Sequence, residues 1–338
     1  MRPISAMELA SLCRIPYYKG GLHLKTSRQK GARLQGVRPC WNKKLIILMT
    51  LPAILHYVVF GILPSSLTAL FSLTDITRTG TEWNFIGLTN YRQLFALQNT
   101  RDTWAAIWRT IAFAVIVTVV KNVIALVLAV LFNSKTLHGR TFYRAMTFMP
   151  SILGVTVCCY AWVLMLGMDG PIYTLLNSLG ISSGLLGSKT DAFPIIIVIQ
   201  IWMSIGYAMV IDIAGLQGIP AELYEAAAID GASPLQQFFK ITLPLLWSTL
   251  SVNILLTTIG SLSLVQPILL TTGGANNTET LAMRIYSSAF GVGKSDSVIA
   301  NSTMGYASAQ AMVLFAIVLV FALFVYFFTK KQEDKYEN

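Results

Sequence analysis

The hydrophobic positions of this chain fall into six long segments, and one markedly polar interval separates the fourth from the fifth. Each segment reaches the roughly 20 apolar residues that an α-helix needs to cross a bilayer. The predicted spans are residues 45–73, 106–132, 145–168, 193–216, 245–270 and 309–329. The pattern therefore predicts an all-α, polytopic membrane protein with six transmembrane helices. Pro52 and Pro64 predict a tilt or kink in the first of them.

The polar interval, residues 217–244, cannot lie in hydrocarbon and has the signals of two short helices. The first helix is indicated by a proline, an acidic residue and a run of alanines at suitable places: Pro220, Glu222 and residues 226–228. Gly231 is expected to end it in the left-handed conformation. Residues 233–236, Ser-Pro-Leu-Gln, have the order of a capping box that starts the second helix. The interval therefore predicts a glycine elbow outside the membrane.

Composition supports a membrane protein, since 54% of residues are hydrophobic and only 12% are charged. The net charge of +10 would suggest a nucleic-acid partner in a soluble chain, but its distribution points elsewhere. Ten of the 25 Lys and Arg residues lie in residues 1–44, beside a single acidic residue. This stretch is predicted to be a basic cytoplasmic tail that faces the lipid bilayer surface, with no nucleic acid bound.

The distribution of the remaining Lys and Arg residues predicts the orientation of the spans. With the amino terminus inside, the cytoplasmic stretches hold seventeen and the outer loops hold six. The positive-inside rule then places residues 217–244 and the tail 331–338 in the cytoplasm, together with the amino terminus.

The polar interval also carries a long, gapped motif. Its fixed positions are Glu225, Ala226, Ala227, Gly231, Ile241, Leu243 and Pro244. This spacing resembles the EAA coupling motif of permease subunits of binding-protein-dependent ABC importers. The resemblance implies a type I importer permease fold and a loop held in a cleft of a cytosolic ATPase. Glu225 would face a basic group there, and Asp230 and Gly231 would belong to the same coupling elbow. An amphipathic helix lying on lipid headgroups would explain the helicity but not the glycine spacing.

Two further stretches resemble permeases of the carbohydrate-uptake type, such as those for maltose, lactose or glycerol phosphate. Residues 85–91 match F-x-G-L-x-N-Y, and residues 270–275 begin an L-T-x-G-G series that continues to residue 309. Ala275 departs from the series, which usually has proline there. Together the resemblances cover residues 45–330, which would form the permease domain.

The resemblance implies the partners and the setting of the chain. A second, homologous permease, two cytosolic ATPase subunits and an extracytoplasmic solute-binding protein would complete the importer in a bacterial cell membrane. ATP and Mg would bind the ATPase subunits, and this chain would hold no cofactor. The sequence contains no catalytic triad, no metal-ligand spacing and no nucleotide fingerprint, so we expect a transport subunit rather than an enzyme.

Polar residues on the fourth and fifth spans predict a solute pathway. Gln200, Ser204 and Tyr207 share one helical face, and Asn253, Thr257 and Ser261 share another. Counted from the coupling Glu, the solute-contacting positions of maltose-type permeases fall on Gln200, Met203, Ser204, Tyr207, Thr257, Gly260 and Ser261. Amides, hydroxyls and aromatic faces suit a neutral sugar. The absence of a cationic stripe on these two spans weighs against a strongly anionic solute.

Three alternatives stay open at this point. The polar stripes could instead serve helix–helix packing. An ion-gradient-driven secondary transporter is the competing class, although it would be expected to show paired intramembrane carboxylates, and Asp212 is the one candidate. Lys121, in the middle of the second span, could pair with Asp212 or extend its ammonium toward the membrane surface.

Overall fold

The computed structural model of the chain describes residues 43–77, 80, 83–134, 136–180, 184–291 and 303–337. The predicted basic tail therefore lies outside the described residues, except for its last two lysines. The chain divides into two compact units, Met1–Ser65 and Ser66–Asn338, and each is described by itself.

The first unit contains the start of the first span. Helix α2 (Lys43–Tyr57) passes through a π-helical turn, η1 (Val58–Ile62), into α3 (Leu63–Phe71), whose end belongs to the second unit. The wide turn lies directly before Pro64, which cannot donate the backbone hydrogen bond of a regular helix. The expected local distortion near Pro64 is thus present in the backbone.

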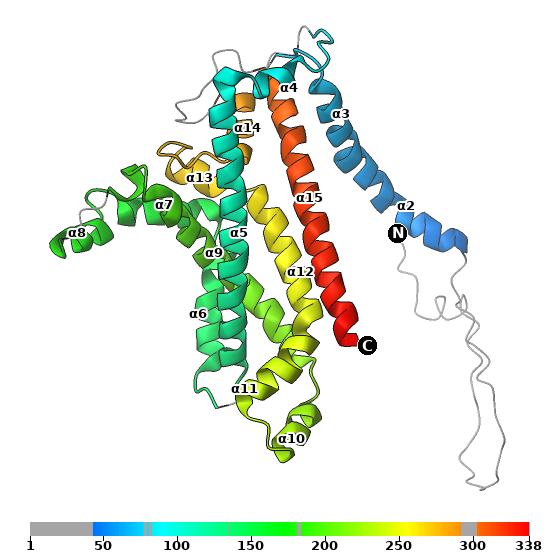
Figure 1. The fold of residues 1–338 in the computed structure, drawn as a ribbon, viewed down its shortest axis with the longest axis vertical. Helices are drawn as coiled ribbons and strands as arrows, with labels where there is room; N and C mark the ends of the chain where they lie inside the picture. The colour runs from blue at the N-terminus through cyan, green and yellow to red at the C-terminus, as the bar shows by residue number, and fades with distance from the viewer. Residues whose placement is uncertain are drawn as a thin grey trace, which may run out of the picture. The chain divides into compact units, whose positions relative to one another are not determined.

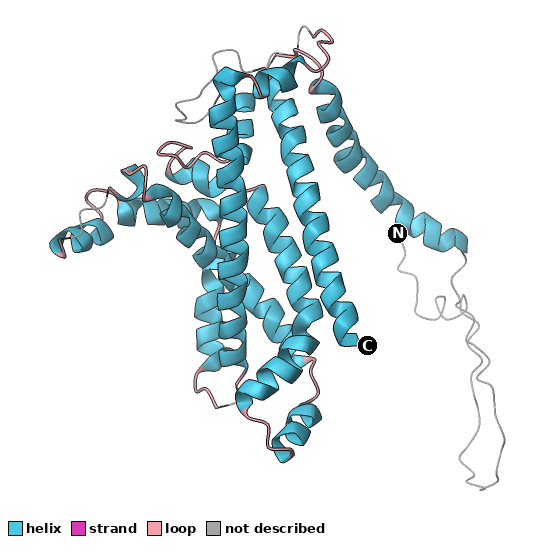
Figure 2. Ribbon diagram, in the orientation of Figure 1, coloured by secondary structure: helices cyan, strands magenta, loops and turns pink. Residues whose placement is uncertain are grey.

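The second unit contains the remaining helices, and its described residues include no β-strand (Figures 1 and 2). In chain order they are α4 (Thr89–Leu94), α5 (Leu97–Asn133), α6 (Arg140–Ile152), α7 (Val155–Leu166), α8 (Pro171–Ser178), η2 (Leu185–Gly187), α9 (Ala192–Gln217), α10 (Ala221–Ile229), α11 (Pro234–Gln237), η3 (Phe238–Thr242), α12 (Leu243–Leu262), α13 (Gln266–Thr271), α14 (Leu281–Phe290) and α15 (Met304–Glu337).

The prediction of six membrane-crossing segments is confirmed. The segments long and apolar enough to span are Ile47–Phe71, Asp102–Asn133, Val155–Ser178, Ala192–Gln217, Pro234–Leu262 and Met304–Lys331. Their bounds agree with the expected ones most closely for the fourth span, because its apolar run has sharp polar limits.

Two of the expected spans have different limits. The stretch 145–168 was expected to be one helix, and this is wrong: α6 ends at Ile152 and α7 begins at Val155, with Leu153 and Gly154 in extended conformations. Glycine has little helix propensity and here precedes the first residue of α7. The fifth span ends at Leu262 rather than 270, because Pro267 stands in the first turn of a separate helix, α13.

The core of the second unit forms where α5, α9 and α12 meet. One cluster joins Ala125 and Ala129 of α5 to Ala208 and Met209 of α9 and to Leu246 of α12. Small residues on α5 and α9 let the backbones approach closely, as is usual in membrane bundles.

Helix α9 also crosses α6 at Gly206. A Cβ atom at this position would run into the Thr147 carbonyl oxygen and would lie 2.7 Å from the Phe148 Cα. Glycine at this crossing is therefore required by packing.

The F-x-G-L-x-N-Y element closes the carboxyl end of the first span. The buried Asn90 donates from Nδ2 to the carbonyl oxygens of Ser72 (2.9 Å) and Thr74 (2.8 Å), and Tyr91 donates its hydroxyl to Ser72 Oγ. These bonds satisfy backbone acceptors that the helix end leaves free. Nearby, Asn84 donates to the Asp75 carboxylate and holds the pKa of that group below its ordinary value.

The Gly-Gly turn after α13 forms although Ala275 replaces the usual proline. Gly273 and Gly274 have positive φ angles, and Thr272 Oγ1 lies 2.6 Å from Thr278 Oγ1. The Ala275 amide donates to the Thr272 carbonyl oxygen at 3.3 Å, a bond that proline could not make.

Candidate functional site: a solute cavity and a coupling elbow

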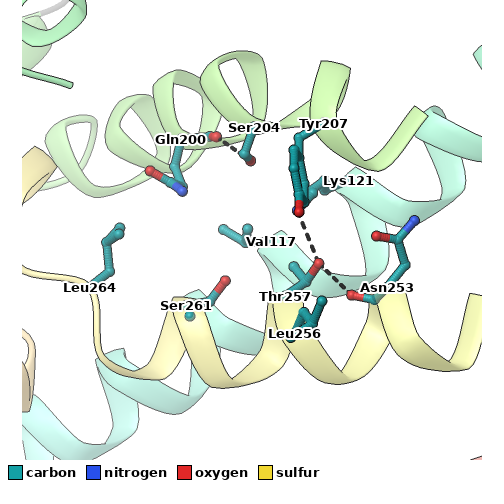
Figure 3. Close-up of a pocket in the computed structure, with 11 residues that line it drawn as sticks. Val117, Lys121, Gln200, Ser204, Tyr207, Asn253, Leu256, Thr257, Ser261 and Leu264 are labelled. Carbon is teal, nitrogen blue, oxygen red and sulfur yellow. Dashed lines mark hydrogen bonds between the residues drawn. The ribbon is translucent and has the colours of Figure 1, made fainter. Parts of the chain in front are cut away.

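A cavity of about 220 Å³ lies within the bundle where α5, α9 and α12 face one another (Figure 3). The residues that line it are Val117, Lys121, Gln200, Ser204, Tyr207, Asn253, Leu256, Thr257, Gly260, Ser261 and Leu264. Most of its polar groups are uncharged amides and hydroxyls. Such a wall offers several donors and acceptors together with one aromatic ring, which is the chemistry of a site for a polyhydroxylated solute.

The structure brings six of the seven residues expected along the pathway around this one cavity. Met203 is the exception: its side chain is buried against Cys158 and Cys159 of α7. Met203 lies three positions, or about 60° around the helix, from Gln200, so it faces the neighbouring helix instead of the cavity. Met203 therefore lies outside the wall of this cavity, and its contact with a solute stays a prediction.

A chain of hydrogen bonds runs along one side of the cavity. Lys121 donates from Nζ to Thr257 Oγ1 at 3.0 Å, and Thr257 donates to the Asn253 carbonyl oxygen at 2.7 Å. Asn253 in turn donates from Nδ2 to Asp212 Oδ1 at 2.8 Å and to the Ala208 carbonyl oxygen at 3.1 Å. This network fixes three polar side chains of α5 and α12 relative to α9.

Lys121 does not extend toward the membrane surface, and it interacts with Asp212 through the attraction of their charges without a close ion pair. Within the described part of the chain, no carboxylate lies within 4.0 Å of the Lys121 ammonium. The one ion pair found there joins Arg284 and Glu279. The side chain is only 7% exposed and ends in the bundle, so it does not reach toward a membrane surface. A lysine at the centre of a span costs about 2.5–3.5 kcal/mol on insertion scales, so its retention suggests a function.

Gly260 helps to distinguish a pathway from simple helix packing. Among the described residues, no atom outside its chain neighbours and the backbone of its own helix lies within 4 Å of the place that a Cβ on Gly260 would occupy. Gly206, in contrast, is required by a close backbone crossing. Within this chain Gly260 therefore leaves open space in the cavity wall and does not bring two helices together.

The coupling elbow has the predicted local structure. Helix α10 ends in a Schellman motif: the Ala232 amide donates to the Ala227 carbonyl oxygen at 2.9 Å and the Gly231 amide to Ala228 at 3.1 Å. Gly231 has φ of 77°, as expected of the left-handed position. The capping box is also confirmed, since Ser233 Oγ accepts from the Gln236 amide and Gln236 Oε1 accepts from the Ser233 amide.

The second helix of the elbow is not short, and this corrects the sequence-based expectation. Helix α11 continues through the π-helical turn η3 directly into α12, so the candidate span runs from Pro234 to Leu262. Pro244 has no amide hydrogen and cannot donate to the Lys240 carbonyl oxygen. The wide turn ahead of it absorbs the missing bond without ending the helix.

The expected coupling residues divide into two groups. Glu225, Ala226, Asp230 and Gly231 are exposed on α10 and the elbow, whereas Ile241, Leu243 and Pro244 are partly buried. Ala227 is partly buried as well, on the face of α10 that turns back to the bundle. The first group is open to solvent, and Leu243 of the second group packs against the core cluster of the bundle.

Large apolar side chains are exposed beside these acidic residues. Ile229 is 86% exposed and Leu235 is 68% exposed, and both lie outside the candidate spans or at the very start of one. Tyr224 holds α10 against the start of the fifth span through a 2.9 Å contact between its hydroxyl and Thr242 Oγ1. The elbow thus displays two large apolar side chains while its first helix is held against the bundle.

The elbow is joined directly to the cavity walls. Helix α9 ends at Gln217, and residues 218–220 connect it to α10. On the other side, α11 is continuous with α12. The two helices that carry most of the cavity's polar residues are thus the two that enter and leave the elbow.

The fold and the site define a class of protein: an α-helical membrane protein with a cavity between three helices and an exposed glycine elbow. Residues 122–334 match the family described as "Binding-protein-dependent transport system inner membrane component". The chain belongs to this family, so it is a membrane-spanning permease component, and the predicted resemblance is confirmed. Family membership also removes the competing class of ion-driven secondary transporters.

Individual relatives agree with this assignment. The chain is 31% identical over 283 residues to the trehalose/maltose transport system permease protein MalF of Thermococcus litoralis, covering 83% of this chain and 92% of that protein. It is 29% identical to the probable starch degradation products transport system permease protein AmyD of Thermoanaerobacterium thermosulfurigenes, with the same shares covered. It is 31% identical to the probable ABC transporter permease protein YurN of Bacillus subtilis, covering 86% and 99%.

A solved structure has the same fold. A chain of a bacterial ABC transporter that imports the acidic polysaccharide alginate superposes with a TM-score of 0.71 at 21% sequence identity. The match covers 85% of this chain and 96% of that one. At this identity the likeness bears on the fold, which is that of an ABC importer permease.

Proposed function

We propose that this chain forms one half of the membrane pathway of an ATP-driven importer for a sugar, an oligosaccharide or a related polyol. The names of its relatives MalF and AmyD, a trehalose/maltose and a starch-product permease, support the substrate class. The cavity of amides, hydroxyls and one tyrosine ring supports it independently.

The observation that carries the mechanism is the direct connection between elbow and cavity through α9 and α12. In the proposal, two cytosolic ATPase subunits hold the exposed face of α10, with Glu225 against a basic group. Their closure on ATP moves the elbow and, with it, two walls of the cavity. The cavity then opens to the outside, receives solute from an external binding protein, and returns when ATP is hydrolysed.

The proposal assigns the remaining parts of the assembly. ATP and Mg bind to the partner ATPase subunits, and this chain has no ATPase site and no cofactor of its own. A second, homologous permease supplies the other half of the pathway. Both termini lie in the cytoplasm, on the side of the elbow, as the distribution of Lys and Arg predicts.

Site-specific cross-linking tests the docking of the elbow. Ile229→Cys on α10 should form a cross-link to the ATPase subunit when the whole importer is treated with a short bifunctional thiol reagent. Phe290→Cys on α14 is a matched control, because Phe290 is also a large, exposed apolar residue (60% exposed) but lies on the predicted outer side. Cross-linking of the ATPase at Phe290 and not at Ile229 would contradict the proposal.

Transport in proteoliposomes tests the energy source. The reconstituted importer should accumulate the solute that its binding protein delivers only when ATP is enclosed on the ATPase side. Accumulation driven by an ion gradient in the absence of the ATPase subunits would contradict an ATP-driven mechanism.

A further inference from the structure

The one charged residue that lines the cavity is Lys121 of α5. Figure 3 shows Lys121 among the lining residues, and its ammonium lies 3.0 Å from Thr257 Oγ1 of α12. The fourth and fifth spans carry no cationic stripe, but the structure adds a cation to their cavity from the second span. The cavity is therefore not a neutral site.

The ammonium of Lys121 has unused hydrogen-bonding capacity toward the cavity. An ammonium group has three donors, and the described contacts account for one, to Thr257 Oγ1 at 3.0 Å. The residue is more than nine-tenths buried, so bulk water does not surround it as it surrounds a surface lysine. A further acceptor inside the cavity would complete its coordination.

Asp212 attracts the charge of Lys121 from a distance, but it forms no ion pair with it and makes its hydrogen bond to another residue. Its Oδ1 accepts from Asn253 at 2.8 Å, and its Oδ2 is buried with no hydrogen-bond partner. Asp212 does not line the cavity, and it lies more than 4.0 Å from the Lys121 ammonium. The charge of Lys121 on the cavity side thus stays open to an anionic group of the solute.

The rest of the wall limits the kind of anion. With a single cation and no arginine, the lining suits one negative charge better than a doubly charged phosphate, for which clustered basic groups or backbone amides are usual. Gln200, Ser204 and Ser261 can bind hydroxyl groups, and the Tyr207 ring can lie against an apolar sugar face. This combination fits a sugar ring that carries one carboxylate.

We propose that the cavity selects acidic sugars, and that Lys121 is the residue that binds the carboxylate of a uronic acid unit. The inference rests on the proposed role of the cavity as the solute pathway and gives that role a substrate class. Thr257 orients the ammonium through its hydroxyl, and the hydroxyl and amide groups opposite bind the sugar. A wall of neutral residues alone would give no preference between an acidic sugar and its uncharged counterpart.

Equilibrium binding to the purified whole importer tests this proposal with two probes of nearly equal shape, glucuronate and its neutral amide, glucuronamide. A charged hydrogen bond of ordinary strength predicts that glucuronate binds about tenfold or more tightly than glucuronamide. Lys121→Met should abolish the preference while leaving glucuronamide binding nearly unchanged, and Lys121→Arg should retain it. Size-exclusion chromatography and a thermal melt of each variant establish that the importer is folded.

A surface lysine supplies the matched control. Lys189→Met removes the same charge from an exposed outer loop, and it should leave the preference for glucuronate intact. Equal affinity of the unmodified importer for the two probes, or no saturable binding of glucuronate, would overturn the proposal without any variant. If Lys121→Met binds neither glucuronate nor glucuronamide, the proposal is also overturned, because Lys121 then has a structural role.

The outcome is separable from that of the proposed function. Equal binding of the two probes, together with ATP-dependent uptake of a neutral oligosaccharide such as maltotriose, would support the proposed importer function. It would contradict the proposed preference for acidic sugars. A strong preference for glucuronate without any ATP-dependent transport would instead support the acidic substrate and contradict the ATP-driven importer.

Discussion

The hydrogen bonds of the Schellman motif and capping box that shape the elbow join residues within 226–236. The cavity, in contrast, is lined by side chains from three helices between Val117 and Leu264. The elbow is exposed and specified locally, by one glycine and a capping box. The cavity is open on one side and depends on how α5, α9 and α12 are packed. Helices α9 and α12 join the two regions. One fold therefore contains a part whose structure is determined by residues close in sequence and a part whose structure is determined by the packing of distant helices.

This difference indicates which property of the protein a single substitution in each region should change. A change in the elbow alters a local backbone conformation and the surface offered to a partner, but leaves the packing of the bundle alone. A change in the cavity alters what the wall can bind, and a change at a helix crossing destabilises the whole unit. The predictions below separate these three outcomes, from the largest effect to the smallest.

Two glycines of the bundle should give opposite results when replaced by leucine. Gly206→Leu forces a side chain into the backbone of α6 and should cost about 3 kcal/mol or more, so little folded protein is expected. Gly260→Leu meets open space and should fold, but it fills the cavity and should abolish solute uptake. Thermal unfolding and uptake by the reconstituted importer measure both effects. If Gly260→Leu is folded and fully active, the cavity is not part of the solute pathway.

Gly231→Val tests the elbow itself. A β-branched residue in the left-handed conformation costs about 1–2 kcal/mol, which lowers the population of the elbow about five- to thirtyfold. We expect the variant to reach the membrane with its bundle intact, and to lose uptake together with ATP hydrolysis stimulated by the binding protein. Gly231→Asn is the control, since asparagine tolerates this conformation. Full transport by Gly231→Val would show that the conformation of the elbow does not matter for coupling.

The hydroxyl groups of the cavity should have intermediate effects. Thr257→Val keeps the shape of the side chain but removes the acceptor of Lys121, and Tyr207→Phe removes only a hydroxyl. Each lost hydrogen bond should weaken solute binding by about 1 kcal/mol, or about fivefold. Titration of the delivered solute into the purified importer measures this. If uptake is unchanged in both variants, the solute does not contact this wall.

The smallest effect is expected at the start of the second elbow helix. Ser233→Ala removes the side-chain half of the capping box and should destabilise that turn by about 1 kcal/mol, without changing the bundle. Amide hydrogen exchange at Gln236, which donates to Ser233 Oγ, should become faster. Ser233→Asp restores an acceptor and should return the exchange rate toward its original value. An unchanged rate in Ser233→Ala would mean that the cap does not hold this turn.

The parts of the fold that depend on local sequence could be predicted. The spans follow from the length of apolar runs, and the elbow follows from Gly231 and the Ser-Pro-Leu-Gln box, because each of these signals acts within a few residues. The break at Leu153 and Gly154 was missed because the apolar pattern continues across it. Hydrophobicity indicates where a chain can lie in a membrane, but not whether its helix is continuous there.

The cavity could be predicted only in part. The polar faces of the fourth and fifth spans indicated most of its polar wall, since helical spacing places such residues together. Lys121 could not be assigned to the cavity, because its place depends on the packing of α5 against α9 and α12 across more than 130 positions of the chain, as its bond to Thr257 shows. Met203 was expected from the resemblance to maltose-type permeases and not from a polar helical face, and in this chain it belongs to a buried cluster with residues of α7, outside the cavity wall.

The unbroken path of helix from Pro234 to Leu262 has a mechanical consequence. Because the helix continues through the π-helical turn η3 without ending, a displacement of its Pro234 end should be transmitted to the stretch beside Thr257 in the same step. Solute release and nucleotide turnover would then share one rate-limiting motion, and slowing either should slow the other in proportion.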